Sequence, residues 1–165
     1  MLKFETERLT IRKMVNSDFN AFRSYYAQPE VQMRVACPNN SREAMRKDFD
    51  NLITNPLSWG IEQRYNGLLI GNIHYFNVTE AYLAEVGYIL SPEYWGRGYM
   101  TEVLREVIAF GFDLGLGRIR AKVEPDNIAS IRLLESCGFS REAMIYEDSY
   151  GDRVVDLIYF TKTKN

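Results

Sequence analysis

A run of twelve residues, SPEYWGRGYMTE (Ser91 to Glu102), places two glycines and an arginine directly ahead of a predicted helix. A helix N-terminus carries unpaired N–H groups and partial positive charge, and both favour an anion. Glycine lets the backbone approach a phosphate closely and adopts dihedral angles that other residues avoid. Gly96 and Gly98 therefore predict a phosphate-binding turn with Arg97 as an added cation, although a tight strand-to-helix turn without a ligand uses the same residues.

Two common nucleotide-binding motifs do not fit this run. A dinucleotide fingerprint needs a third glycine at position 101, which is Thr101, and an acidic residue about 20 positions later, where RIRAK is basic. A P-loop needs Gly-Lys followed by Ser or Thr, which the run lacks. The predicted phosphate therefore belongs to another kind of ligand.

The segments on either side of the run predict a sheet that carries it. Apolar and polar residues alternate in RIRAKVE, so Ile119, Ala121 and Val123 would face a core. The pair Asn66-Gly67 lies between two strand-like segments and is the strongest short signal for a hairpin. The predicted strands cover residues 9–14, 58–65, 68–78, 82–90, 118–124, 139–147 and 153–162.

Helices are predicted from apolar residues at helical spacing and from their end signals. Ser17 and Asp18 would cap the first helix, which carries Phe19, Phe22 and Tyr26 on one face. Others would follow the NNS triplet, the glycine run and the Asp-Asn pair at 126–127. Hairpins together with a strand–helix–strand crossover predict an α/β fold in one domain over residues 1–165, with a mixed, mostly antiparallel sheet of about seven strands and helices on both faces.

Composition limits the function of such a domain. With 165 residues, of which 46% are hydrophobic, the chain can bury a packed core. A net charge of −2 gives no electrostatic case for nucleic acid or an anionic membrane, and no apolar run approaches the roughly 20 residues of a membrane span. Cys37 and Cys137 lie in no metal-ligand spacing. We expect a cytoplasmic protein with two free thiols and no metal, and the sequence leaves its oligomeric state open, a homodimer included.

The glycine run resembles the acetyl-CoA pyrophosphate loop of the GNAT N-acetyltransferase superfamily. It is most similar to the branch that acetylates the N-termini of ribosomal proteins (RimJ/RimL-like), whose pattern Pro-x-Tyr-Trp-Gly-Arg/Lys-Gly-Tyr-x-Thr-Glu here runs from Pro92 to Glu102. TERLTIR (6–12), AEVGYIL (84–90) and NIASIRLLESCGF (127–139) are similar to the opening strand, the central strand and the second cofactor helix of that branch. The resemblance spans essentially the whole chain.

This resemblance implies transfer of the acetyl group of acetyl-CoA to a primary amine, by direct attack in a ternary complex. The acceptor would be a protein N-terminal amine or a small-molecule amine. Glu93 departs from the wider superfamily, which has Gln or Arg there, and its acidic side chain cannot help to hold phosphate. The rival interpretation is a non-catalytic sensor that binds acyl-CoA. The residues implied to hold acetyl-CoA are Tyr88, Ile89, Leu90, Gly96, Arg97, Gly98, Tyr99, Met100, Thr101, Asn127 and Ser130.

Two residues are implied to move protons. Glu85 has the position of the central-strand glutamate that serves as general base in several superfamily members; an outward-facing strand glutamate is the alternative. A base matters more for a lysine-like amine, with a pKa of about 10.4, than for an α-amine near 7.7–8, which a water chain could also deprotonate. Ser130 resembles the residue near the CoA sulfur, with a serine bonded back to a helix carbonyl as its alternative. For Asn127, expected to bind pantetheine, the alternative is helix capping.

Overall fold

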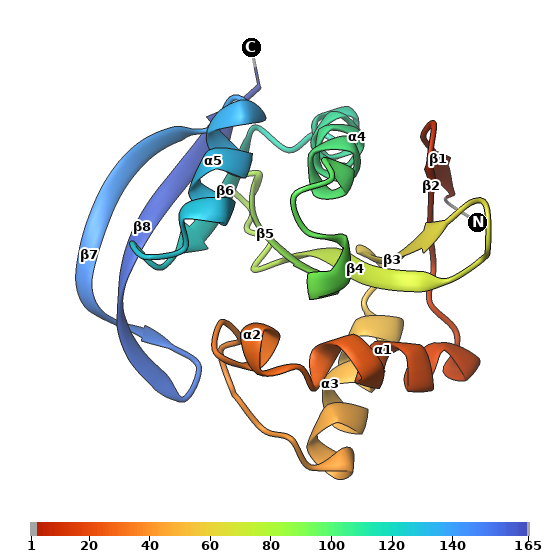
Figure 1. The fold of residues 1–165 in the computed structure, drawn as a ribbon. Helices are drawn as coiled ribbons and strands as arrows, with labels where there is room; N and C mark the ends of the chain where they lie inside the picture. Colours follow the sequence, from red (N-terminus) through yellow and green to blue (C-terminus); the bar gives the residue numbers. More distant parts are fainter. Residues whose placement is uncertain (1–2, 165) are drawn as a thin grey trace. The chain divides into compact units, whose positions relative to one another are not determined.

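The computed structural model describes residues 3–164, which form helices and an eight-stranded sheet (Figure 1). The chain divides into two compact units, one of residues 3–74 and 88–99 and the other of residues 75–87 and 100–164. The single domain expected over residues 1–165 stays a prediction. Within residues 3–164, no helix combines the length and the apolar character that a membrane crossing needs.

The first unit contains antiparallel strands in the order β1-β2-β3-β4, followed in the chain by the end of β5 and the glycine run. The two final residues of β4 belong to the second unit. The elements are β1 (Phe4–Glu5), β2 (Leu9–Arg12), the 3-10 turn η1 (Asn16–Asp18), α1 (Phe19–Tyr26), α2 (Pro29–Gln32), α3 (Arg42–Thr54), β3 (Ser58–Gln63), β4 (Leu69–Phe76) and the 3-10 turn η2 (Pro92–Tyr94).

Local signals in the sequence explain these elements. The hydroxyl of Ser41 accepts a hydrogen bond from the N–H of Ala44 at 3.1 Å and caps α3, as a helix start after NNS predicts. The β3–β4 hairpin turns at Gly67, whose φ of +71° lies in the left-handed region. Phe22 and Phe49 join α1 to α3, with ring centroids 5.2 Å apart. The aromatic faces of these helices therefore form a core of their own, within the first unit.

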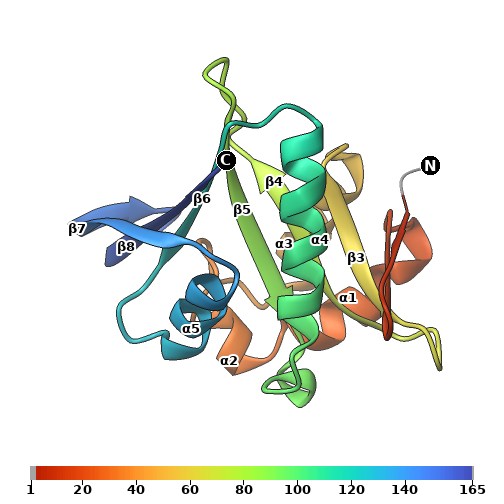
Figure 2. The same ribbon diagram turned by 90° about the horizontal axis from the view of Figure 1, so that it is seen from above.

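The second unit has the strand order β5-β6-β8-β7. Strands β5 and β6 are parallel, with Leu83 opposite Arg118, and the remaining pairs are antiparallel. The strands β7 and β8 lie side by side along their length in both views (Figures 1 and 2). The elements are β5 (Leu83–Leu90), α4 (Tyr99–Asp113), β6 (Arg118–Val123), α5 (Ile128–Ser136), β7 (Ser140–Tyr150) and β8 (Arg153–Thr163), where residues 88–90 of β5 and residue 99 of α4 belong to the first unit.

The fold class predicted from the sequence is confirmed. The sheet is mixed and mostly antiparallel, and it has one strand more than expected because the dipeptide Phe4–Glu5 pairs with β2. The alternation in RIRAKVE is confirmed, since Ile119, Ala121 and Val123 are all buried. Both cysteines are free thiols, as expected.

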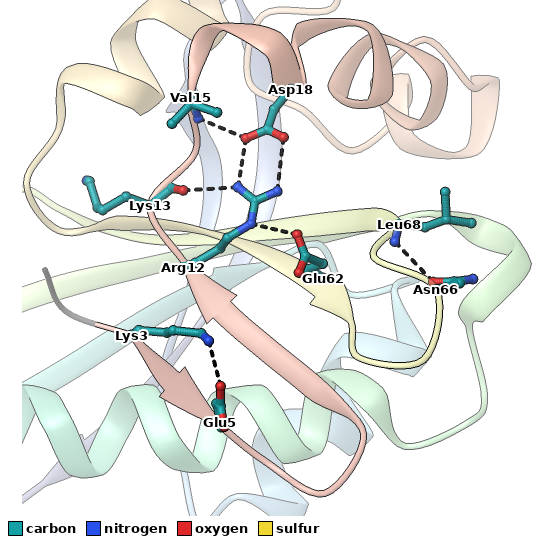
Figure 3. A network of polar contacts seen from close by, with 9 residues as sticks. All are labelled: Lys3, Glu5, Arg12, Lys13, Val15, Asp18, Glu62, Asn66 and Leu68. Carbon is teal, nitrogen blue, oxygen red and sulfur yellow. Dashed lines mark hydrogen bonds and ion pairs between the residues drawn. The ribbon is translucent and has the colours of Figure 1, made fainter.

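Asp18 occupies the N-cap position of α1, as predicted, but its side chain makes no capping hydrogen bond to that helix. A 3-10 turn precedes the helix, and Asp18 turns its carboxylate back toward the chain that leads into it. Oxygen Oδ2 accepts hydrogen bonds from the N–H of Val15 and from Nη1 of Arg12, both at 2.8 Å, while Oδ1 accepts from Nη2 of Arg12 at 3.0 Å. The Nε of Arg12 donates to Glu62 at 2.6 Å (Figure 3). The carboxylate of Asp18 therefore binds Arg12 and the N–H at the start of η1, and it does not cap α1.

The Arg12→Met substitution is expected to lower the free energy of unfolding by about 2 kcal/mol at pH 7, because it leaves the buried Asp18 without its cationic partner. Burial acts to raise the pKa of Asp18, but the hydrogen bonds from Arg12 and Val15 outweigh burial and lower it. This stabilisation is therefore fully present above the unfolded pKa of about 3.9 and is lost as the pH falls through the lower folded value.

Urea unfolding at pH 7 and pH 3 measures the loss of stability and its dependence on pH. The difference in free energy of unfolding between the parent and Arg12→Met should be smaller at pH 3 than at pH 7. Lys3→Met is the matched control, since its ion pair with Glu5 is exposed (Figure 3) and contributes little. A loss of stability by Arg12→Met that is the same at both pH values would contradict the assignment to Asp18.

Candidate functional site

The glycine run has the backbone that an anion site requires. Gly96 and Gly98 have φ of +71° and +76°, where residues with a Cβ are strained. A Cβ added to Gly96 would meet no atom within 4 Å. Within residues 3–164, no backbone carbonyl accepts a hydrogen bond from the N–H of Gly96, Arg97 or Gly98. Unpaired N–H groups at such a turn are the kind of donor that binds the oxygens of an anion such as a phosphate.

The end of β5 is tied to this run within the first unit. The indole Nε1 of Trp95 donates a hydrogen bond to the carbonyl of Leu90 at 2.7 Å. The N–H of Ser91 donates to the carbonyl of Ile70 on β4 at 2.8 Å. These two hydrogen bonds hold the turn between the end of β5 (Tyr88–Leu90) and Gly96, so they fix the position of the glycine run relative to this end of the strand.

Arg8 and Gln63 contact the residues directly before α4 and at its first position. Arg8, directly before β2, donates from Nη1 to the carbonyl of Arg97 at 3.0 Å, and its guanidinium lies 4.3 Å from the ring centroid of Tyr99. The Nε2 of the buried Gln63 donates to the Tyr99 hydroxyl at 3.3 Å. The side chain of Arg97 lies over the ring of Tyr94, 5.6 Å from its centroid.

In the second unit, Glu85 is buried and its carboxylate has two polar partners. The Nζ of Lys122 lies 3.3 Å from Oε1, and the Nδ2 of Asn77 donates to Oε2 at 3.4 Å. Burial pulls the pKa of Lys122 down, but attraction to Glu85 and Tyr159 outweighs burial and raises that pKa above its usual value. Glu85 is therefore a buried carboxylate paired with a charged lysine, and the outward-facing alternative is excluded.

A tyrosine from the last strand also contacts Lys122. The ring centroid of Tyr159 lies 5.0 Å from Nζ of Lys122, and the phenol donates a hydrogen bond to Asp148. Partial burial and this hydrogen bond raise the pKa of Tyr159. Asp148 follows a bulge in β7, where Glu147 has a φ of +50°. Bulges of this kind redirect side chains and are frequent next to active sites.

The two polar residues at the start of α5 meet each other. The Oδ1 of Asn127 accepts a hydrogen bond from the N–H of Ser130 at 3.3 Å, so Asn127 caps the helix. That is the alternative that the sequence had left open. The binding of pantetheine by Asn127 and the proton donation by Ser130 stay predictions.

The structure brings together three groups of predicted residues: the glycine run with the end of β5, Glu85 with its polar partners, and Asn127 with Ser130. Sequence reasoning missed Arg8 and Lys122, which contact the first and second groups. Both had a weak signal. Lys122 stands on the polar side of an alternating strand, and Arg8 lies within the TERLTIR segment.

Comparisons with known proteins identify the family. A family model, the Acetyltransferase (GNAT) domain, matches residues 8–140. The N-acetyltransferase p20 of Bacillus licheniformis is 33% identical over 169 residues, which cover 96% of this chain and 94% of the relative.

Solved structures share the same fold. An acetyltransferase of the GNAT family from Bacillus anthracis superposes with a TM-score of 0.89 at 24% identity, covering 98% of each chain. The ribosomal-protein-S5-alanine acetyltransferase of Vibrio fischeri has a TM-score of 0.81 at 23% identity, covering 100% of this chain and 98% of its own. The spermidine N-acetyltransferase of Vibrio cholerae, solved with CoA and spermine, has a TM-score of 0.82 at 20% identity, covering 96% of each chain. At these identities the likeness establishes the fold.

Proposed function

Because the chain belongs to the GNAT acetyltransferase family and is an N-acetyltransferase, we propose that it transfers the acetyl group of acetyl-CoA to a primary amine by direct attack in a ternary complex. The observation that carries this proposal is the run of N–H groups from Gly96 to Gly98, which have no backbone acceptor among the described residues. We place the protein in the cytoplasm, whose reducing conditions suit the free thiols Cys37 and Cys137.

Acetyl-CoA supplies the activated acetyl group when it is bound. The N–H groups of Gly96, Arg97 and Gly98, with those of the first turn of α4, would hold its diphosphate. The backbone of Tyr88–Leu90 would lie along the pantetheine, and the side-chain amide of Asn127 would donate to it. In each case the chain contributes fixed polar groups that orient the thioester.

Glu85 would take the proton that the amine must lose. The hydrogen bond from Asn77 and the ion pair with Lys122 hold both carboxylate oxygens in place, which suits a residue that must accept a proton at a defined point. The hydroxyl of Ser130 would give a proton to the departing thiolate of CoA. Tyr159, held through its phenol by Asp148, would contribute to the lining of the amine site.

The acceptor is either the α-amine of a protein N-terminus or the amine of a small molecule. The neighbours of this fold include an enzyme named for the alanine of a ribosomal protein and one named for spermidine. We propose that the loop 33–40 and the segment after Val78 select the amine, because connecting loops carry specificity in most enzyme folds.

A panel of amines tests the function. CoA release is measured with peptides that begin with alanine or serine, the same peptides with blocked N-termini, and the polyamines spermidine and spermine. We expect release with at least one class of free amine, and the mass of the product identifies the acetylated group. Tight binding of acetyl-CoA with no release for any amine would instead support a non-catalytic sensor.

A further inference from the structure

Arg8 reaches the glycine run from a distant part of the chain. Its backbone is fixed, because its carbonyl accepts a hydrogen bond from the N–H of Arg64 at 3.0 Å and the next residue, Leu9, is fully buried. From this position Nη1 donates to the carbonyl of Arg97 at 3.0 Å. The position that a Cβ would take on Gly98 lies 3.5 Å from Nη2. The guanidinium therefore contacts the peptide group that joins Arg97 to Gly98.

The same guanidinium also packs on the first residue of α4. Its central carbon lies 4.3 Å from the ring centroid of Tyr99, a distance at which a cation is attracted to an aromatic face. Tyr99 cannot turn away easily, since Gln63 donates to its hydroxyl and the ring of Tyr94 lies 6.2 Å away. Arg8 is thus held against both ends of the Arg97–Tyr99 turn.

We propose that Arg8 is a positioning residue for the diphosphate of acetyl-CoA, which it orients through the peptide between Arg97 and Gly98. In a trans peptide the C=O of one residue and the N–H of the next point in opposite directions. By holding the carbonyl of Arg97, the guanidinium turns the N–H of Gly98 away from itself and toward the ligand. A cationic donor on the carbonyl also polarises the peptide, which strengthens the opposite N–H as a donor.

This role differs from that predicted for Arg97, whose side chain would add charge directly. A substitution of the Arg97 side chain keeps the hydrogen bond from Arg8 to the carbonyl of residue 97, whereas a substitution of Arg8 removes that hydrogen bond. Arg8 belongs to the TERLTIR segment, so this role would explain why that segment and the glycine run occur together in one chain. It rests on the proposed function, because the ligand is the diphosphate of acetyl-CoA.

The test compares Arg8→Gln and Arg8→Lys with the parent, using calorimetric binding of CoA and of dephospho-CoA, which keeps the diphosphate but lacks the 3′-phosphate. Because Arg8→Gln loses one charge-assisted hydrogen bond, we expect it to raise the dissociation constants of CoA and of dephospho-CoA about tenfold, by the same factor for both. Arg8→Lys should retain part of the affinity, since it keeps the charge but not the planar fork. In turnover, the KM for acetyl-CoA should rise while the KM for the amine stays unchanged.

Arg64→Gln is the matched control, since its guanidinium donates instead to the carbonyls of Thr6 and Glu7. An affinity of Arg8→Gln for dephospho-CoA within twofold of the parent, or an equal loss in Arg64→Gln, would overturn the inference. If Arg8→Gln does not fold, as judged by thermal melting, Arg8→Lys answers the same question. A parent protein that binds no CoA would refute the proposed function itself. If the parent binds CoA and Arg8→Gln binds it equally well, only the present inference is refuted.

Discussion

Replacing Gly98 with valine is expected to weaken acetyl-CoA binding about a hundredfold. At a φ of +76° a β-branched side chain is strongly strained, so the turn must rearrange. The added Cβ itself would lie at an ordinary contact distance, 3.5 Å, from Nη2 of Arg8, so the strain comes from the backbone. The rearranged backbone displaces the N–H groups that are proposed to hold the diphosphate. Calorimetric titration with acetyl-CoA measures the loss.

Gly67→Val provides a control for backbone strain alone. Gly67 has a nearly identical φ of +71° and lies in the β3–β4 hairpin, where an added Cβ meets nothing within 4 Å. We expect similar losses of thermal stability in the two variants but an unchanged acetyl-CoA dissociation constant in Gly67→Val. Unchanged affinity in Gly98→Val would refute the phosphate site.

Replacing Glu85 with glutamine is expected to lower the rate of acetyl transfer by roughly 10²–10⁴-fold at low pH, the range typical of a lost general base. The loss should shrink as the pH approaches the pKa of the acceptor amine, because a growing fraction of the amine is then already neutral. For an α-amine this occurs near pH 7.7–8, and for a lysine-like amine near pH 10.4. The pH dependence of kcat/KM measures the effect and indicates the class of acceptor.

Glu124→Gln controls for the loss of a paired carboxylate in the same unit. Glu124 is half-buried and forms an ion pair with Arg153 at 2.9 Å. We expect it to change thermal stability but not the shape of the pH–rate profile. A Glu85→Gln profile identical to that of the parent would remove Glu85 from the role of base and leave its ion pair with Lys122 as a structural feature.

The order and type of the longer elements could be predicted because the local signals agree with the tertiary structure, whereas the short helix α2 was missed. RIRAKVE has one strictly apolar side, and the NNS triplet supplies a serine cap, so neither segment depends on distant residues for its secondary structure. The short β1 had no such signal. A dipeptide carries no periodicity, and Phe4–Glu5 becomes a strand only because β2 pairs with it.

The partners of the functional residues could not be predicted in the same way. Asp18 matches a helix cap in the sequence, but its carboxylate meets the guanidinium of Arg12 once the chain has folded. Lys122 and Arg8 act on residues 37 and 89 positions away, respectively, and no spacing rule connects such distant ionic groups. Sequence reasoning therefore identified groups that could do chemistry, whereas the structure identified the groups that hold them.

The hydrogen bond between the indole of Trp95 and Leu90 gives the protein an optical reporter. The chain has two tryptophans; Trp59 is 1% exposed, whereas Trp95 is 48% exposed and directly precedes the first glycine of the run. A ligand bound at that run is expected to change the emission of Trp95 and to leave the emission of the buried Trp59 unchanged. Intrinsic emission can therefore follow occupancy in real time, without a label and on the unmodified chain.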